Sequence, residues 1–126
     1  MKYLVLCYYD VKKFEALDKD RLAAMMAECK ARDIEFKATG KVDFVGSQGK
    51  PDTWKCIRGP KGGKAELTQG PWTEAKEQVG AFFIVEAKDM DEALAVAMKH
   101  PGPHVVQYCG GGLEIRPCDF YEEPNK

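Results

Sequence analysis

The sequence predicts an α+β fold in which two helices cover one face of an antiparallel sheet. Two observations favour it. Two short, strongly apolar segments, near the N-terminus and in the middle of the chain, have the length and composition of buried strands. Each is followed by a polar segment with helical periodicity, and shorter strand-like segments bounded by Gly and Pro complete the pattern. The 126 residues suit one domain, spanning residues 1–126.

The first strand is expected over residues 2–9, which are rich in Leu, Val and Tyr and end at Asp10. Alternation places apolar side chains on both faces of this strand, so both faces should be covered.

A long helix should begin after Asp18, a good N-cap residue, and run towards Gly40, a natural stop for a helix. Apolar residues at helical spacing predict one buried face: Leu22, Met25, Met26, Cys29 and Phe36.

The middle of the chain predicts short strands over residues 41–45 and 53–58. The turn-forming sequence Gly-Pro-Lys-Gly-Gly at 59–63 should then fold residues 64–68 back as a hairpin.

Residues 79–87 form the clearest predicted strand, again apolar on both faces. A second helix follows, with Asp89 as its N-cap, Glu92 in a capping-box position, and Pro101 ending it after His100. The Gly/Pro-rich stretch after it is expected to be a loop, before a last strand over residues 113–116.

The order is therefore β-α-β-hairpin-β-α-β, the ferredoxin-like plan with an extra hairpin. In this plan the helices cover only one face of the sheet, yet both principal strands are apolar on both faces. The second face needs a cover. The simplest cover is the same face of a second copy, so the sequence predicts a homodimer.

The composition argues against several classes of function. A formal net charge of −1, with scattered Lys and Arg, predicts no nucleic-acid partner. The N-terminal apolar stretch is too short for a membrane span and lacks a signal-peptide cleavage site. Five cysteines without a CxxC pair favour a reducing cytoplasm.

Neither a metal nor a cofactor is predicted. His100 and His104 are four residues apart, but Pro101 and Pro103 oppose a helix that would align them. With Cys109 they still do not make a closed set of four ligands. Cys109 itself is expected in a solvated loop, with no base assigned to it.

The candidate site is the segment 69–80, QGPWTEAKEQVG. Trp72 is large for a surface connection, and Glu74, Lys76 and Glu77 come directly before the buried strand. One interpretation is a solvated charged loop with Trp72 filling the core. The other is a cleft at the mouth of the strand, where partial burial tunes a carboxylate for acid–base chemistry.

Three further residues join the candidates. His100 is either a helix-capping residue or the proton carrier of the same cleft. Arg58 and Arg116, at strand ends, either bind an anionic ligand or form ion pairs at the surface.

Several blocks in order resemble the YCII-related family, in its DGPF branch, over nearly the whole chain. They are MKYLVLCYYD with KKFEAL, MMAEC, GPWTEAKEQVGAFFIVEAKDMDEA, KHPG and LEIRP. The resemblance implies a dimeric α+β barrel of ferredoxin-like protomers. It also implies relatives of mostly unassigned function, including sigma-factor-associated accessory proteins and a dehydrochlorinase of a hydroxylated aromatic.

The resemblance also implies site residues. The Asp-Gly-Pro-Phe motif of the family falls on Gln69–Trp72, and the positions after it match Glu74, Lys76, Glu77 and Gly80. Gln69 replaces the aspartate, and no histidine precedes His100, so a His/Asp mechanism lacks its residues here.

Two functions stay open from the sequence. One is an enzyme acting on a small aromatic or anionic molecule, with Glu77 or His100 moving protons, Trp72 as an apolar wall, and Gln69, Glu74, Lys76, Arg58 or Arg116 binding the ligand. The other is a non-catalytic regulatory module that binds a metabolite or a protein.

Overall fold

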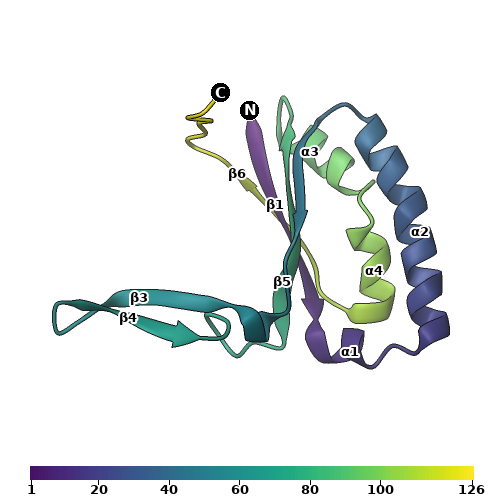
Figure 1. Cartoon of the computed structure of the whole chain (residues 1–126). Helices are drawn as coiled ribbons and strands as arrows, with labels where there is room; N and C mark the ends of the chain where they lie inside the picture. Colours follow the sequence, from purple (N-terminus) through teal and green to yellow (C-terminus); the bar gives the residue numbers. More distant parts are fainter.

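The structure, a computed structural model, describes the backbone of residues 1–126 and every side chain except that of Lys61 (Figure 1). Its main sheet is antiparallel, with the strand order β2-β5-β1-β6. The strands are β1 (Lys2–Asp10), β2 (Val42–Ser47), β5 (Glu77–Glu86) and β6 (Gly112–Pro117). Together with the helices this is the ferredoxin-like arrangement, and the predicted α+β class is confirmed.

All the principal helices lie on one face of this sheet (Figure 1). They are α2 (Lys19–Ala38), α3 (Met90–Ala97) and α4 (Gly102–Cys109), and a short helix, α1 (Val11–Glu15), follows β1 directly. The core between helices and sheet centres on Phe36 and Phe83, both fully buried, with ring centroids 4.7 Å apart in an edge-to-face contact. Val5 and Val85 complete its centre.

The two predicted N-caps are present. The Asp18 carboxylate accepts a hydrogen bond from the Arg21 N–H at 2.8 Å, and the Asp89 carboxylate accepts one from the Glu92 N–H at 2.9 Å. The Glu92 side chain in turn accepts from the Lys88 N–H at 3.2 Å, so this helix begins with a reciprocal pair of the capping-box type.

Four local expectations are corrected. The second helix ends at Ala97 rather than at His100, and the stretch expected to be a loop forms α4. Pro103 is tolerated there because it lies in the first helical turn, where its missing N–H has no intrahelical partner to lose. Cys109 is therefore fully buried at the end of α4 and not in a solvated loop. Met26, expected on the buried face of α2, is 56% exposed.

The other face of the main sheet, the outer face, is also apolar. Leu4 lies opposite Ile84 and Leu6 opposite Phe82, all of them only half-buried. The ring of Phe82 lies over Gly46 on β2, where a Cβ atom would come within 2.6 Å of it. Both central strands therefore have two apolar faces, as predicted, and in the single chain one of them faces outwards.

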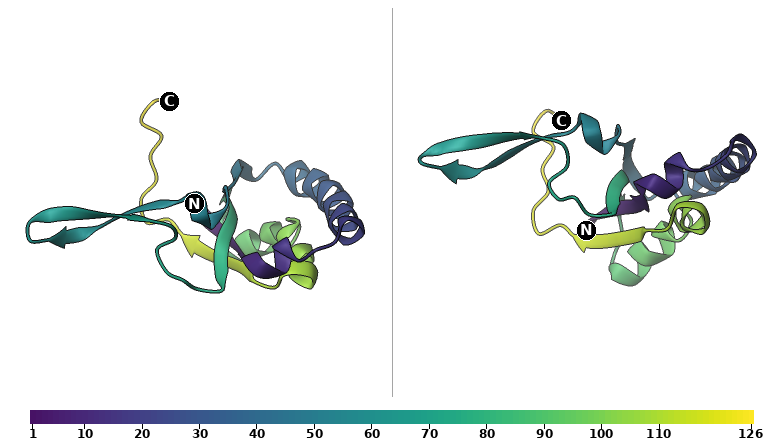
Figure 2. Two further views of the ribbon diagram at one scale, coloured as in Figure 1. Left: turned by 60° about the horizontal axis from the view of Figure 1, so that its bottom comes forward. Right: turned by 90° about the horizontal axis from the view of Figure 1, so that it is seen from below.

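The predicted hairpin is β3 (Lys55–Lys61) and β4 (Lys64–Gln69), preceded by the 3-10 turn Pro51–Thr53. It forms a two-stranded sheet of its own and projects from the body on the side opposite the helices (Figures 1 and 2). We call residues 55–69 the arm. Among the helices that the structure describes, none is both long and apolar enough to cross a membrane.

Candidate functional site

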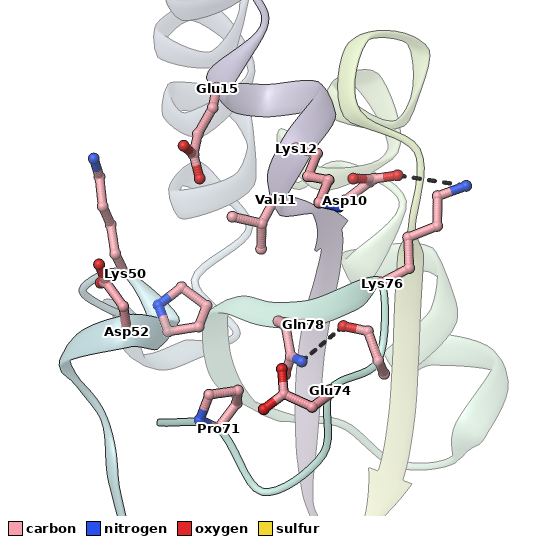
Figure 3. A pocket seen from close by; sticks show the side chains of 12 residues that line it. Asp10, Val11, Lys12, Glu15, Lys50, Asp52, Pro71, Glu74, Lys76 and Gln78 are labelled. Carbon is pink, nitrogen blue, oxygen red and sulfur yellow. Dashed lines mark hydrogen bonds and ion pairs between the residues drawn. The ribbon is translucent and has the colours of Figure 1, made fainter. Parts of the chain in front are cut away.

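A cleft with a volume of about 810 Å³ lies at the end of β1, where α1 begins (Figure 3). Two walls enclose it: α1 with the 3-10 turn before the arm, and the segment that leads from the arm into β5. Its lining side chains are mainly charged: Asp10, Lys12, Glu15, Lys50, Asp52, Glu74 and Lys76, with Val11, Pro51, Pro71, Ala75 and Gln78. The volume is typical of sites for small molecules.

Asp10 is the buried carboxylate of this cleft, with only 2% of the residue exposed. It ends β1 and caps α1, its Oδ1 accepting a hydrogen bond from the Lys13 N–H at 3.2 Å. Its Oδ2 lies 3.5 Å from Nζ of Lys76 (Figure 3). Burial raises the pKa of Asp10, but the Lys13 N–H and the charge of Lys76 together lower it below its ordinary value. The group is therefore an anion at neutral pH.

The segment before β5 brings two predicted residues, Glu74 and Lys76, to the cleft. Its path is fixed by Gln78, whose Nε2 donates to the carbonyl oxygens of Thr73 and Ala75, both at 2.8 Å. A single amide thus satisfies two loop carbonyls and holds the turn that presents both charged side chains.

Glu77 points to a different neighbour. Its Oε2 accepts a hydrogen bond from the Gly111 N–H at 2.7 Å, which joins the start of β5 to the loop before β6. Glu77 is paired with Asp10 in the sheet register but does not line the cleft.

Gln69, Arg58 and Trp72 gather at the base of the arm. Arg58 donates from Nη2 to the Trp72 carbonyl oxygen at 2.9 Å, and its guanidinium lies 4.4 Å from the centroid of the Trp72 ring. Trp72 is 59% exposed, so it does not fill the core. Gln69 donates from Nε2 to the carbonyl oxygen of Asp52, a cleft residue, at 2.8 Å.

Arg116 lies on β6 and is paired with Leu4 of β1, so it belongs to the outer face of the sheet. Its Nη2 is 2.5 Å from Oε1 of Glu114, which also accepts from the Tyr8 hydroxyl at 3.2 Å. The structure thus places Arg116 in an ion pair on the outer side of the sheet, apart from the cleft.

His100 lies between α3 and α4, packed against the helix side of the sheet. Its ring stacks on Phe83 at 4.5 Å and meets Phe36 edge-on at 4.9 Å. Its Nδ1 accepts a hydrogen bond from the Gly102 N–H at 2.8 Å, which uses the unprotonated nitrogen of a neutral ring. Burial lowers the pKa of His100 to about 4. The ring is not part of the cleft lining, and its role as a proton carrier stays a prediction.

The sequence reasoning missed Asp10 as a site residue. In the sequence Asp10 marks the end of a predicted strand, but an aspartate between an apolar strand and Val-Lys-Lys is also an N-cap signal. Among the residues whose side chains the structure describes, no group of three or more His, Cys, Asp or Glu is arranged to hold a metal ion.

Fold and cleft together define a ferredoxin-like α+β domain whose charged cavity is compatible with binding a small molecule. The sequence profile described as the YCII-related domain matches residues 1–108, and the chain belongs to this family. It is 28% identical over 124 residues to the uncharacterized protein R00369 of Rhizobium meliloti (strain 1021), covering 97% of this chain and 95% of the relative.

Among solved structures, the chain is similar to 5-chloro-2-hydroxyhydroquinone dehydrochlorinase (TftG) from Burkholderia phenoliruptrix AC1100 in complex with 2,5-dihydroxybenzoquinone. The TM-score is 0.50 with 16% sequence identity, over 94% of each chain. At this identity the similarity shows the fold alone.

Proposed function

We propose that the cleft binds a small polar molecule, held by the carboxylate of Asp10 and the ammonium group of Lys76. The observation that carries this proposal is a buried, ionised carboxylate, paired with Lys76, among the residues that line a cavity of about 810 Å³. A buried charge is costly to desolvate and is retained where it has a partner. Here the partner is an exposed lysine, which a ligand can replace or share.

The charges indicate the chemistry of the ligand. An ionised Asp10 accepts a hydrogen bond from a hydroxyl or an ammonium group, and Lys76, whose Nζ lies 3.5 Å from Oδ2 of Asp10, can pair with an anionic oxygen of the same ligand. A hydroxylated aromatic that carries a second, ionised oxygen satisfies both. The 2,5-dihydroxybenzoquinone in the structurally similar dehydrochlorinase belongs to this class, which supports it as a first probe.

Binding without proton transfer is favoured over acid–base catalysis at Asp10. A carboxylate whose pKa lies below its ordinary value is a weak base, so it orients a ligand better than it removes a proton. If the protein turns over its ligand, Glu77 and His100 are the groups predicted to carry protons. A regulatory module that only binds a metabolite is the alternative function.

We also propose that the protein works as a homodimer that covers the outer faces of two sheets. Leu4, Leu6, Phe82 and Ile84 form a continuous apolar surface on the central strands, and Phe44, on the neighbouring edge strand, is 47% exposed. Exposed apolar surfaces of this kind mark interaction sites, and a self-complementary patch closes in a two-fold dimer.

The cleft is tested by calorimetric titration with 2,5-dihydroxybenzoquinone. Asp10→Asn removes the charge while asparagine still caps α1, so we expect binding at least about tenfold weaker in a folded protein. Asp18→Asn, the same change at the N-cap of α2, is the matched control and should leave the affinity unchanged. Equal affinity in the wild type and Asp10→Asn would reject the assignment of Asp10.

Catalysis is tested separately, by chromatography of the bound ligand after incubation with the protein. Turnover that survives in His100→Ala would exclude His100 as the proton carrier. No turnover of any molecule that binds would favour the regulatory module.

A further inference from the structure

The arm makes few contacts with the rest of its own chain. Within the part of the chain that the structure describes, no helix or other strand makes more than a marginal contact with β3 or β4. A lone two-stranded hairpin is marginally stable in water. Yet this one carries Ile57 directly opposite Leu67, and these side chains are 74% and 76% exposed. An apolar pair at the middle of an unsupported hairpin calls for a partner surface.

The direction in which the arm projects indicates the identity of that partner. The arm projects from the body on the side opposite the helices, the side on which the apolar outer face is exposed (Figures 1 and 2). A second copy seated on the outer face therefore lies alongside the arm. This step rests on the dimer proposed above.

The same chain offers a surface to receive the arm. An apolar groove of about 310 Å³ lies between α3, α4 and β6. Its lining includes Leu94, Met98, Pro103, Val106, Leu113 and Ile115. Leu94 is 46% exposed and Met98 66% exposed, although both lie beside the edge strand of the sheet.

One two-fold arrangement of the facing sheets brings the two surfaces together. The arm follows β2, one edge of the main sheet, and the groove flanks β6, the other edge. A two-fold axis parallel to the strands, between two facing sheets, places the β2 edge of each copy beside the β6 edge of the other. Both unpaired edges then gain a neighbour, and the arm of one copy passes the edge where the groove of the other opens.

We propose that each arm docks on a second copy of this chain, with Ile57 and Leu67 in the apolar groove between its α3, α4 and β6. The two arms clasp the dimer reciprocally, since the same contact occurs twice about the two-fold axis.

The test is the dimer dissociation constant of the full chain, measured by sedimentation equilibrium. Leu67→Lys on the arm and Met98→Glu in the groove should each weaken the dimer at least about tenfold. The double variant Leu67→Lys with Met98→Glu should recover most of the affinity, because the two new charges meet across the interface. Glu66→Lys, on the face of β4 opposite to Leu67, and Ala95→Glu, outside the groove lining, place charges on exposed positions of the arm and of α3 and should have no effect on the dimer.

The outcomes separate the two proposals. A wild-type protein that stays monomeric at all concentrations overturns both the dimer and the docked arm. A dimer that Leu67→Lys leaves unchanged overturns the docking alone. If the variants do not fold, hydrogen exchange in the wild type decides: protection of the arm amides should rise with protein concentration, and fast exchange in a proven dimer contradicts the docking.

Discussion

The carboxylate of Asp10 is almost fully buried, yet the ammonium group 3.5 Å from its Oδ2 belongs to Lys76, whose side chain is 72% exposed. The lining of the cleft therefore combines an anion fixed by β1 and α1 with a cation on a flexible stem. Such a lysine can turn towards a ligand while the carboxylate stays in place. The pair is suited to exchange an internal contact for one with a bound molecule.

Lys76→Met is expected to raise the pKa of Asp10, because the lysine charge is one of the interactions that lower it. The carboxyl resonance of Asp10 in a ¹³C NMR titration measures this directly. In the wild type the group should titrate below its ordinary value of 3.8. The contribution of Asp10 to the unfolding free energy is therefore fully present above its ordinary pKa. It is lost as the pH falls through the lowered pKa of the folded state. Lys12→Met, another lysine of the cleft lining, is the control. An equal rise of the Asp10 pKa in this variant would contradict a specific pairing of Asp10 with Lys76.

His100 should make stability fall in mild acid. Its pKa in the folded protein is about 4 against 6.5 for an ordinary histidine, so the folded state disfavours the charged ring. The contribution of His100 to the unfolding free energy is fully present above pH 6.5 and is lost as the pH falls from there towards 4. At full burial the loss corresponds to roughly 3 kcal/mol, and solvent screening of the partly exposed ring reduces it to about 2 kcal/mol.

Urea unfolding at pH 7 and pH 4.5 measures that loss. His100→Gln should be less stable at pH 7, because the ring contacts with Phe83 and Phe36 are gone, but should lose less on acidification. His104→Gln keeps His100 and should retain the steeper dependence. Parallel curves for the wild type and His100→Gln would show that His100 is not the acid-sensitive group.

Gly111 should tolerate no side chain. Its φ is +80°, and a Cβ atom there would lie 2.0 Å from the Tyr8 carbonyl oxygen. Gly40 also has a positive φ, +71°, but a Cβ atom at that position meets nothing within 4 Å. Gly40→Ala should therefore cost about 1 kcal/mol of unfolding free energy, and Gly111→Ala more than about 3 kcal/mol. The thermal unfolding temperatures of the two variants measure this difference. Gly40→Ala has only an unfavourable backbone conformation, whereas Gly111→Ala also has a steric clash.

Arg58→Lys should loosen the junction between the arm and the cleft. Lysine keeps the charge but loses the flat group that lies over the Trp72 ring and donates to its carbonyl oxygen. We expect a cost of about 1 kcal/mol and a change in tryptophan emission. Arg32→Lys, which alters only an exposed pair with Glu28 on α2, should change neither. Unaltered emission in Arg58→Lys would mean that the stacking does not persist in solution.

The sequence was most informative where structure is decided locally. The caps at Asp18 and Asp89 are hydrogen bonds between residues three apart, and the two apolar strands follow from the length and composition of their apolar segments. Helix α4 was missed because Gly102 and Pro103 look like a loop until they are recognised as a first helical turn.

The candidate site was only partly accessible to such reasoning. Glu74 and Lys76 line the cleft as one interpretation expected, whereas Trp72 and Gln69 lie at the base of the arm. Asp10 joins the site through the pairing of β1 with β5, a contact between distant parts of the chain. Such contacts have no local sequence pattern, so neither the burial of Asp10 nor its partner Lys76 was predictable.

The segment that forms one wall of the cleft is also the strap that joins the last residue of the arm to β5. Displacing the arm therefore pulls on Glu74 and Lys76. If the arm is held by a second copy, affinity for the ligand and affinity between protomers are thermodynamically coupled, and each changes the other by the same factor. Dilution that separates the protomers should then shift the affinity of the cleft for its ligand.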